Sequence, residues 1–321
     1  MGSVPETTDG NSRDDPHEYK VNLGIGAYRD DEGRTWVLNS VKEAKEQMAM
    51  GDWSHEYLPL HGNDCLLEAS RKILFGQRLY DLISDWSASI QTISGTGANS
   101  LIARFAGKFL GPCNIWLPDP SWDNHVRLWN HNAPNITQRR YPYYNSADRS
   151  FDFDAFMVTM TQQAAKGDIV LLHACAHNPT GLDPNQEQWT QIASLCQEKK
   201  LFVVFDVAYQ GFASGDIQQD AWSVRHFLSR PDLEVAVCQS FSKNLGLYGE
   251  RVGVLHIIPS RTYSTSAASA VMGQLFEIQR GTVSMGPRFG AEVASRVLSD
   301  DCLFQLWIKD LAVMSGRIKR M

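Results

Sequence analysis

Paired cysteines, long apolar runs and basic clusters are all missing from this chain of 321 residues. Its six cysteines show no C-x-x-C spacing, so we expect free thiols in a reducing compartment and not a disulfide framework. No apolar run approaches the roughly 18 residues that cross a bilayer, so we expect no membrane span. The net charge is −6, from 30 Lys+Arg and 36 Asp+Glu, and the lack of a Lys/Arg cluster argues against nucleic-acid binding.

The amino-terminal segment also lacks targeting features. Residues 1–20 contain neither the apolar core of a secretory signal nor the Arg-rich, acid-poor composition of a transit peptide. We therefore expect a cytoplasmic protein.

The chain does contain a regular alternation of short apolar runs with amphipathic stretches. Several runs are almost continuously hydrophobic, which is typical of strands buried on both faces. Alternating strands and helices predict an α/β fold with a mostly parallel sheet flanked by helices. The predicted strands are 90–93, 114–117, 169–173, 201–205, 234–238 and 251–258, and the predicted helices are 98–109, 154–166 and 187–199.

Ligands of such sheets bind at the carboxyl ends of the strands, so the residues that follow each strand are informative. The run Ser94-Gly95-Thr96-Gly97-Ala98 follows one predicted strand and opens a helix. Small residues there let backbone N–H groups approach an anion, and the helix dipole favours a phosphate. A tight strand-to-helix turn explains the same residues equally well.

Two ionisable residues follow other predicted strands. Asp206 ends a hydrophobic run, where a carboxylate is costly unless it has a cationic partner such as a protonated ring nitrogen. Helix capping or a core salt bridge is the alternative role for Asp206. Lys243 follows the strand 234–238, where burial or nearby positive charge would lower its pKa and favour Schiff-base formation, although a surface lysine is the alternative. The S-x-x-K spacing of Ser240 and Lys243 also occurs in penicillin-binding enzymes, but their S-D-N and K-T-G motifs are absent here.

Together, a phosphate cradle, a carboxylate and a lysine at strand ends match the needs of pyridoxal phosphate. Arg251, eight residues after Lys243, adds a second charge for the phosphate. Longer motifs make the chain resemble the class I aspartate aminotransferases, which are fold type I pyridoxal-phosphate enzymes. These motifs are VNLGIGAYR (21–29), HEYLP (55–59), LHACAHNPTG (172–181), FD (205–206), AYQGFASG (208–215), QSFSKN (239–244) and ERVG (250–253).

The resemblance implies a role for each matching residue around the cofactor. Lys243 would hold the cofactor and move the reacting proton, and Asp206 would pair with the ring nitrogen with support from His125. Tyr57 would reach the phosphate in the neighbouring subunit. The other implied cofactor contacts are Ser94, Gly95, Thr96, Ser240 and Arg251 at the phosphate, Trp122 against the ring, and Asn178 and Tyr209 at the ring oxygen. No metal site is implied.

The same resemblance implies the substrate contacts Gly26, Trp122, Asn178 and Arg280. Arg280 would bind the side-chain carboxylate of the substrate from the neighbouring subunit, because its planar fork makes two parallel hydrogen bonds. The usual Ser-Asn-Pro-Pro that follows reads Ser284-Met285-Gly286-Pro287 here. A second arginine, which binds the α-carboxylate in this family, has no counterpart before Met321, so we expect a chain truncated at its C-terminus.

The resemblance also implies the domain organisation and the activity. Residues 1–36 would be an N-terminal arm with a remnant of the small domain, 37–308 the large cofactor-binding domain, and 309–321 the start of the interdomain helix. The expected activity is amino transfer between L-aspartate or L-glutamate and 2-oxo acids (2-oxoglutarate or oxaloacetate), in a homodimer with shared active sites. Two alternatives stay open: a cofactor-binding chain with weak or no turnover, and a pyridoxal-phosphate enzyme for another amino acid.

Overall fold

A computed structural model describes residues 16–17, 26–52 and 54–321 of the chain. The chain divides into two units, Met1–Val37 and Leu38–Met321. In the first unit, the Tyr28 ring packs edge-on against Trp36 with centroids 5.6 Å apart. Residues 21–25 of the predicted motif 21–29, and most of the predicted segment 1–36, lie outside the described residues.

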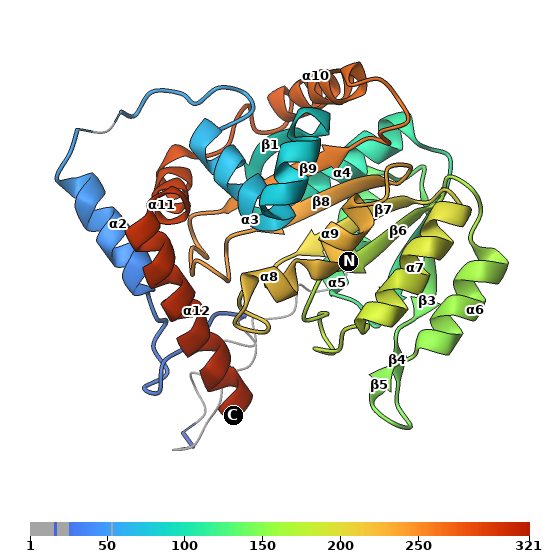
Figure 1. The fold of residues 1–321 in the computed structure, drawn as a ribbon, viewed down its shortest axis with the longest axis horizontal. Helices are drawn as coiled ribbons and strands as arrows, with labels where there is room; N and C mark the ends of the chain where they lie inside the picture. Colours follow the sequence, from blue (N-terminus) through green and yellow to red (C-terminus); the bar gives the residue numbers. More distant parts are fainter. Residues whose placement is uncertain (1–15, 18–25, 53) are drawn as a thin grey trace. The chain divides into compact units, whose positions relative to one another are not determined.

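A seven-stranded sheet forms the centre of the unit Leu38–Met321 (Figure 1). Strands β8, β7, β6, β2 and β3 pair in parallel, whereas β9 runs antiparallel to both of its neighbours, β8 and β1. The predicted mostly parallel mixed sheet is therefore confirmed. In spatial order the strands are β1 (Ala88–Ile93), β9 (Val252–Ile258), β8 (Glu234–Ser240), β7 (Phe202–Val207), β6 (Ile169–His173), β2 (Asn114–Asp119) and β3 (Thr137–Pro142).

Helices cover both faces of this sheet, and alternate residues of each buried strand point into two separate apolar clusters. In β7, Val203 and Phe205 face one cluster, and Phe202 and Val204 face the other. The first cluster includes residues of α3 (Asp64–Ile83), α6 (Phe153–Gln163), α7 (Gln186–Glu198) and α9 (Trp222–Leu228); the second includes residues of α4 (Ser94–Phe109), α5 (Asp123–Asn132) and α10 (Ser266–Arg280). The remaining elements are α2 (Asn39–Ala49), η1 (Ser84–Trp86), β4 (Tyr144–Asn145), β5 (Ser150–Phe151), α8 (Ile217–Asp220), α11 (Arg288–Ser299) and α12 (Asp301–Arg320).

All six predicted strands and all three predicted helices are present, with ends that differ by a few residues. Helix α4 begins at Ser94 and not at 98, because the small residues 94–98 after β1 already belong to its first turn. Strand β3 escaped prediction. Its sequence TQRRYP is largely polar, and it forms the edge of the sheet, where only Tyr141 is buried.

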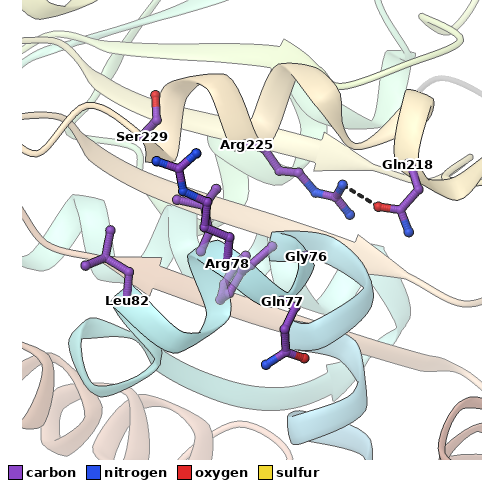
Figure 2. Close-up of a pocket in the computed structure, with 9 residues that line it drawn as sticks. Gly76, Gln77, Arg78, Leu82, Gln218, Arg225 and Ser229 are labelled. Carbon is purple, nitrogen blue, oxygen red and sulfur yellow. Dashed lines mark hydrogen bonds between the residues drawn. The ribbon is translucent and has the colours of Figure 1, made fainter.

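Helix α3 is interrupted at Gly76, which has φ 71° and ψ 155°. The interruption frees backbone carbonyls, and Arg225 of α9 satisfies two of them: its Nε donates to Leu74 O and its Nη2 to Ile73 O, both at 2.9 Å. Figure 2 shows this guanidinium between the two helices, beside Gln218, in a surface pocket that also contains Arg78 and Leu82. No predicted cofactor or substrate contact lines this pocket.

Helices α2 and α12 lie side by side (Figure 1). The carboxylate of Asp310, 2% exposed, accepts hydrogen bonds from the backbone N–H (2.9 Å) and Oγ (2.9 Å) of Ser40 and from Asn39 Nδ2 (3.0 Å). It thereby caps the N-terminus of α2 from another helix. The proposed boundary between 37–308 and 309–321 falls inside the continuous helix α12. No helix in the described residues is both long and apolar enough to span a membrane.

Candidate active site

Three hydroxyl groups gather where β1 and β8 end. The buried Ser94 Oγ lies 3.3 Å from Ser240 Oγ and 2.7 Å from Ser242 Oγ. The guanidinium of Arg251, at the start of β9, donates to Ser242 Oγ at 3.4 Å. These groups meet because β9 is antiparallel to both neighbours. The first residues of β9 therefore lie beside the last residues of β1 and β8.

The backbone of this cradle is strained at two positions. Ser94 has φ 59° and Arg251 has φ 54°, in the left-handed region that costs a non-glycine residue roughly 1–2 kcal/mol. The two residues support each other, because the Ser94 N–H donates to the Arg251 carbonyl at 3.0 Å. Strain of this kind concentrates at functional sites.

Two glycines let these backbones approach each other. A Cβ on Gly253 would lie 2.5 Å from the carbonyl carbon of Ser94 and 2.8 Å from the carbonyl oxygen of Gln239. A Cβ on Gly95 would lie 3.0 Å from Ser240 Cβ. The cradle therefore requires glycine at positions 95 and 253 as well as its polar groups.

A carboxylate and two histidines form a second group, at the ends of β7 and β6 and on α5. Asp206 Oδ2 lies 3.3 Å from Nε2 of the fully buried His125, which also lies 3.1 Å from His173 Nε2. His173 Nδ1 accepts the backbone N–H of Asn178 at 3.0 Å. Burial and the neighbouring His125 hold the pKa of His173 well below its usual value. The ligand atoms of these three side chains lie within 4.8 Å of one another, a grouping that could hold a metal ion, but their contacts with one another suit the orientation of a carboxylate.

The lysine lies in the turn after β8. Burial, and secondly the positive charge of Arg251, lower the pKa of Lys243. Its Nζ lies 5.3 Å from the centroid of the Tyr248 ring. The turn is anchored from α12, because Trp307 Nε1 donates to the carbonyl of Asn244 at 2.7 Å. A half-buried amine with a lowered pKa is the form of lysine that attacks an aldehyde.

Three further predicted residues lie next to this group. Trp122 lies at the N-terminal end of α5, with its ring edge-on to His125 at a centroid distance of 5.1 Å. Burial raises the pKa of Tyr209, and the charge of Asp206 raises it further. Asn178 is held through its backbone by His173.

The substrate contacts are less fully assembled. Arg280 ends α10, is exposed, and donates from Nη1 to Ser284 Oγ at 2.8 Å. The side chain of Tyr57 is 79% exposed. Gly26 belongs to the other unit of the chain and is exposed. A cavity of about 370 Å³ does connect the cradle residues Thr96 and Arg251 with Thr282 and Val283, which follow Arg280.

These residues fit pyridoxal phosphate. Hydroxyls, the N-terminus of α4 and Arg251 suit the phosphate, and the buried Asp206 suits a ring nitrogen. Lys243 suits the aldehyde. The structure therefore brings together the predicted residues Ser94, Gly95, Ser240 and Arg251 in one group and Asp206, His125, Trp122 and Tyr209 in another.

Sequence reasoning missed two members of these groups. Ser242 follows Ser240 by two residues and shares its contact with Ser94, so the alternation of the strand end was the available signal. His173 ends β6 and is paired in register with Asp206 on β7. Its place at the end of a buried run was the same signal that singled out Asp206.

Comparison with known proteins supports this interpretation. The family model described as "Aminotransferase class I and II" matches residues 18–321. An L-tyrosine:2-oxoglutarate aminotransferase of Aspergillus ustus is 43% identical over 318 residues, which are 96% of this chain and 60% of that protein. The cytoplasmic aspartate aminotransferase of Schizosaccharomyces pombe is 42% identical over 311 residues, 96% of this chain and 74% of that protein.

The fold agrees as well. The solved structure of the cytoplasmic aspartate aminotransferase of Saccharomyces cerevisiae superimposes with a TM-score of 0.94 at 39% identity, covering 100% of this chain and 79% of that one. The chain thus spans between three fifths and four fifths of the length of these relatives. The solved aromatic-amino-acid aminotransferase of Burkholderia pseudomallei, covalently bound to pyridoxal phosphate, is 33% identical with a TM-score of 0.90. The predicted fold type and the pyridoxal-phosphate cofactor of the family are confirmed, and the chain belongs to the class I and II aminotransferases.

Proposed function

We propose that the chain is a pyridoxal-phosphate-dependent aminotransferase that moves an amino group between L-aspartate or L-glutamate and a 2-oxo acid. The proposal is supported by the placement of Lys243, Asp206 and the Ser94–Ser242–Arg251 cradle at the same end of the sheet, where strands β1, β7 and β8 end. When bound, the cofactor supplies an electron-accepting ring. Asp206, oriented by His125, keeps a ring nitrogen protonated, and Lys243 takes and returns the proton of the substrate carbon.

Substrate recognition is assigned to Arg280, whose fork suits the second carboxylate of a dicarboxylic amino acid. A second candidate substrate class is aromatic. It is favoured by the 43% identical relative named for L-tyrosine, and by Met285-Gly286 after Arg280 in place of the family's Asn-Pro.

The test begins with the covalent link between cofactor and chain. The protein is purified with pyridoxal phosphate, reduced with borohydride, and digested for mass spectrometry. We expect the cofactor on the peptide that contains Lys243, and none in Lys243→Ala. Labelling elsewhere would refute the cofactor assignment.

Activity is then followed with 2-oxoglutarate and either L-aspartate or L-tyrosine. Production of oxaloacetate supports the dicarboxylate assignment. Turnover of L-tyrosine alone supports the aromatic one. A labelled Lys243 with neither product would leave a cofactor-binding chain without turnover.

We also propose a homodimer in which Tyr57 and Arg280 serve the neighbouring site. The 79% exposure of Tyr57 and the exposed position of Arg280 are consistent with such a role. The test mixes the two inactive variants Lys243→Ala and Arg280→Leu. If Arg280 acts across the interface, each mixed dimer has one intact site and activity on L-aspartate returns. If it acts within its own subunit, no mixed site is intact and no activity returns.

We propose a cytoplasmic location, as in the related cytoplasmic aspartate aminotransferase of Schizosaccharomyces pombe. Related proteins named cytoplasmic and mitochondrial both occur, so fractionation of cells that express the tagged protein decides between the two compartments.

A further inference from the structure

A buried amide on the edge strand β1 joins two segments that are distant in sequence. The side chain of Gln91 has no exposed surface. Its Oε1 accepts the backbone N–H of Asn63 at 3.0 Å, and its Nε2 donates to the carbonyl of Pro287 at 2.8 Å. The Gln91 backbone N–H donates to the His61 carbonyl at 2.8 Å. One residue thus holds the loop before α3 and the loop before α11.

Two glycines enclose this side chain. A Cβ on Gly62, which has φ +104°, would lie 2.2 Å from Gln91 Cβ. A Cβ on Gly286 would lie 2.4 Å from Gln91 Nε2. Gln91 cannot move aside without cost, because both ends of its amide are hydrogen-bonded in a buried site.

A second buried amide lies next to the first. Gln279, 2% exposed, donates from Nε2 to the carbonyls of Leu60 and Gln91, both at 3.1 Å. It immediately precedes Arg280, and its own carbonyl accepts the N–H groups of residues 282, 283 and 284 at 3.0 Å each. The position of Arg280 is therefore fixed by the residue beside it.

The loop that contains Tyr57 is tied to the same region. Arg288, at the start of α11, donates from Nε to the carbonyl of Glu56 at 3.0 Å. The segments 56–63 and 279–288 are consequently held together by Gln91, Gln279 and Arg288. One segment contains Tyr57 and the other contains Arg280.

We propose that Gln91 and Gln279 form a latch that fixes Arg280 and Tyr57 relative to each other and so determines specificity for substrates with a second carboxylate. The inference rests on the proposed function of these two residues. A bidentate arginine is sensitive to small displacements, because an error of about 1 Å in positioning can cost up to about a hundredfold in rate. The side-chain amides of Gln91 and Gln279 bind backbone groups of the two segments, so we treat both residues as positioning residues.

The test uses Gln91→Met, which keeps the side-chain volume and deletes both amide hydrogen bonds. Gly286→Ala, which introduces a methyl group against the Gln91 amide, is the second variant in case the first does not fold. The matched control is Gln138→Met. Gln138 lies on β3 at the opposite edge of the sheet, and its Nε2 donates to Val126 O and Asn130 Oδ1.

Two readouts are measured. In the holoenzyme, we expect the ratio of kcat/KM for L-aspartate to that for L-tyrosine to fall roughly tenfold, through the KM for aspartate, with no change in the control. In the cofactor-free protein, we expect hydrogen exchange to accelerate together in segments 56–63 and 279–288.

An equal loss for both amino acids, or exchange that stays unchanged in either segment, would overturn the latch. If the wild-type protein acts on no dicarboxylic amino acid, the proposed function fails instead. The coupled exchange of the two segments still decides whether the latch exists.

Discussion

The closest approach of two backbones in the cradle provides a graded test of its construction. Gly253 of β9 pairs with Thr92 of β1 and with Ser240 of β8. Its hypothetical Cβ lies 2.5 Å from the Ser94 carbonyl carbon, whereas ordinary contacts begin at 3.4 Å, so a methyl group requires a shift of about 0.9 Å. The obstacle is backbone, which cannot rotate away. We expect Gly253→Ala to destabilise the cofactor-free protein by about 2–3 kcal/mol.

In Gly253→Ala, this shift of the Ser94 backbone would also move Ser94 Oγ away from the hydroxyls of Ser240 and Ser242. The loss of one charge-assisted hydrogen bond to a phosphate corresponds to about 1.5–3 kcal/mol, or roughly 10–100-fold in affinity. Two other glycines calibrate the series. The new methyl group of Gly95→Ala would lie 3.0 Å from Ser240 Cβ and 3.5 Å from its Oγ. Alanine gains about 0.5–1 kcal/mol over glycine in a helix, so we expect nearly unchanged stability with roughly tenfold weaker phosphate binding. Gly249→Ala meets no atom within 4 Å and serves as the control.

Urea unfolding of the cofactor-free variants measures stability, and titration with inorganic phosphate and with pyridoxal phosphate measures affinity. The expected order of loss is Gly253, then Gly95, then Gly249. If Gly253→Ala unfolds within about 0.5 kcal/mol of the wild type and binds phosphate equally well, the proposed construction of the cradle is wrong.

Three further predictions concern the scaffold. Arg225→Met leaves the carbonyls of Ile73 and Leu74 without their donor at the α3 interruption, and should destabilise the protein by about 2–4 kcal/mol in urea unfolding. Arg225→Lys should have intermediate stability. Equal stability of the wild type and both variants would show that the Arg225 hydrogen bonds do not stabilise the interruption. Asp310→Asn should cost about 2 kcal/mol through the lost cap of α2, whereas Asp301→Asn on the exposed start of α12 serves as control and should cost less than about 1 kcal/mol. Burial lowers the pKa of His256 to about 3, below its usual value near 6.5, so the unfolded chain binds one more proton between these pH values and stability falls as the pH falls through this window. Because the unfolded histidine is only partly protonated near pH 6.5, the slope from His256 averages about 1 kcal/mol per pH unit between pH 7 and 5. Urea unfolding at pH 7, 6 and 5 should show the slope reduced by about that amount in His256→Gln; an unchanged slope would assign the pH dependence to other groups.

The central sheet was largely predictable because its strands are buried on both faces and read as unbroken apolar runs. The antiparallel direction of β9 was not predictable from its residues, since Val252–Ile258 is as hydrophobic as its parallel neighbours. The polar edge strand β3 lacked this signal altogether. Residue pattern therefore indicated which segments are strands, but not the order in which all of them pair.

The site shows a similar division. Asp206 and Ser94 could be found because they directly follow apolar runs, and Lys243 because it follows one within five residues. The hydrogen bonds of His173 and Ser242 depend on which strands are neighbours, and that information is not local in sequence. Gln91 was hidden for a different reason. A glutamine inside a strand of otherwise mixed polarity carries no distinctive pattern until the loops that cover it are known.

The reversed strand β9 also has a consequence for folding and ligand linkage. Strands β8 and β9 are joined by a short local connection, so Ser240, Ser242 and Arg251 can come together early in folding. Ser94 comes from β1, about 160 residues away in sequence, and closes the cradle only when β1 docks on the exposed side of β9. An anion that bridges Ser94 and Arg251 therefore binds only the docked state. At a concentration one hundred times its dissociation constant, such a ligand stabilises the docked state of β1 by about 2.7 kcal/mol. Cofactor binding therefore stabilises the pairing of edge strand β1 with β9.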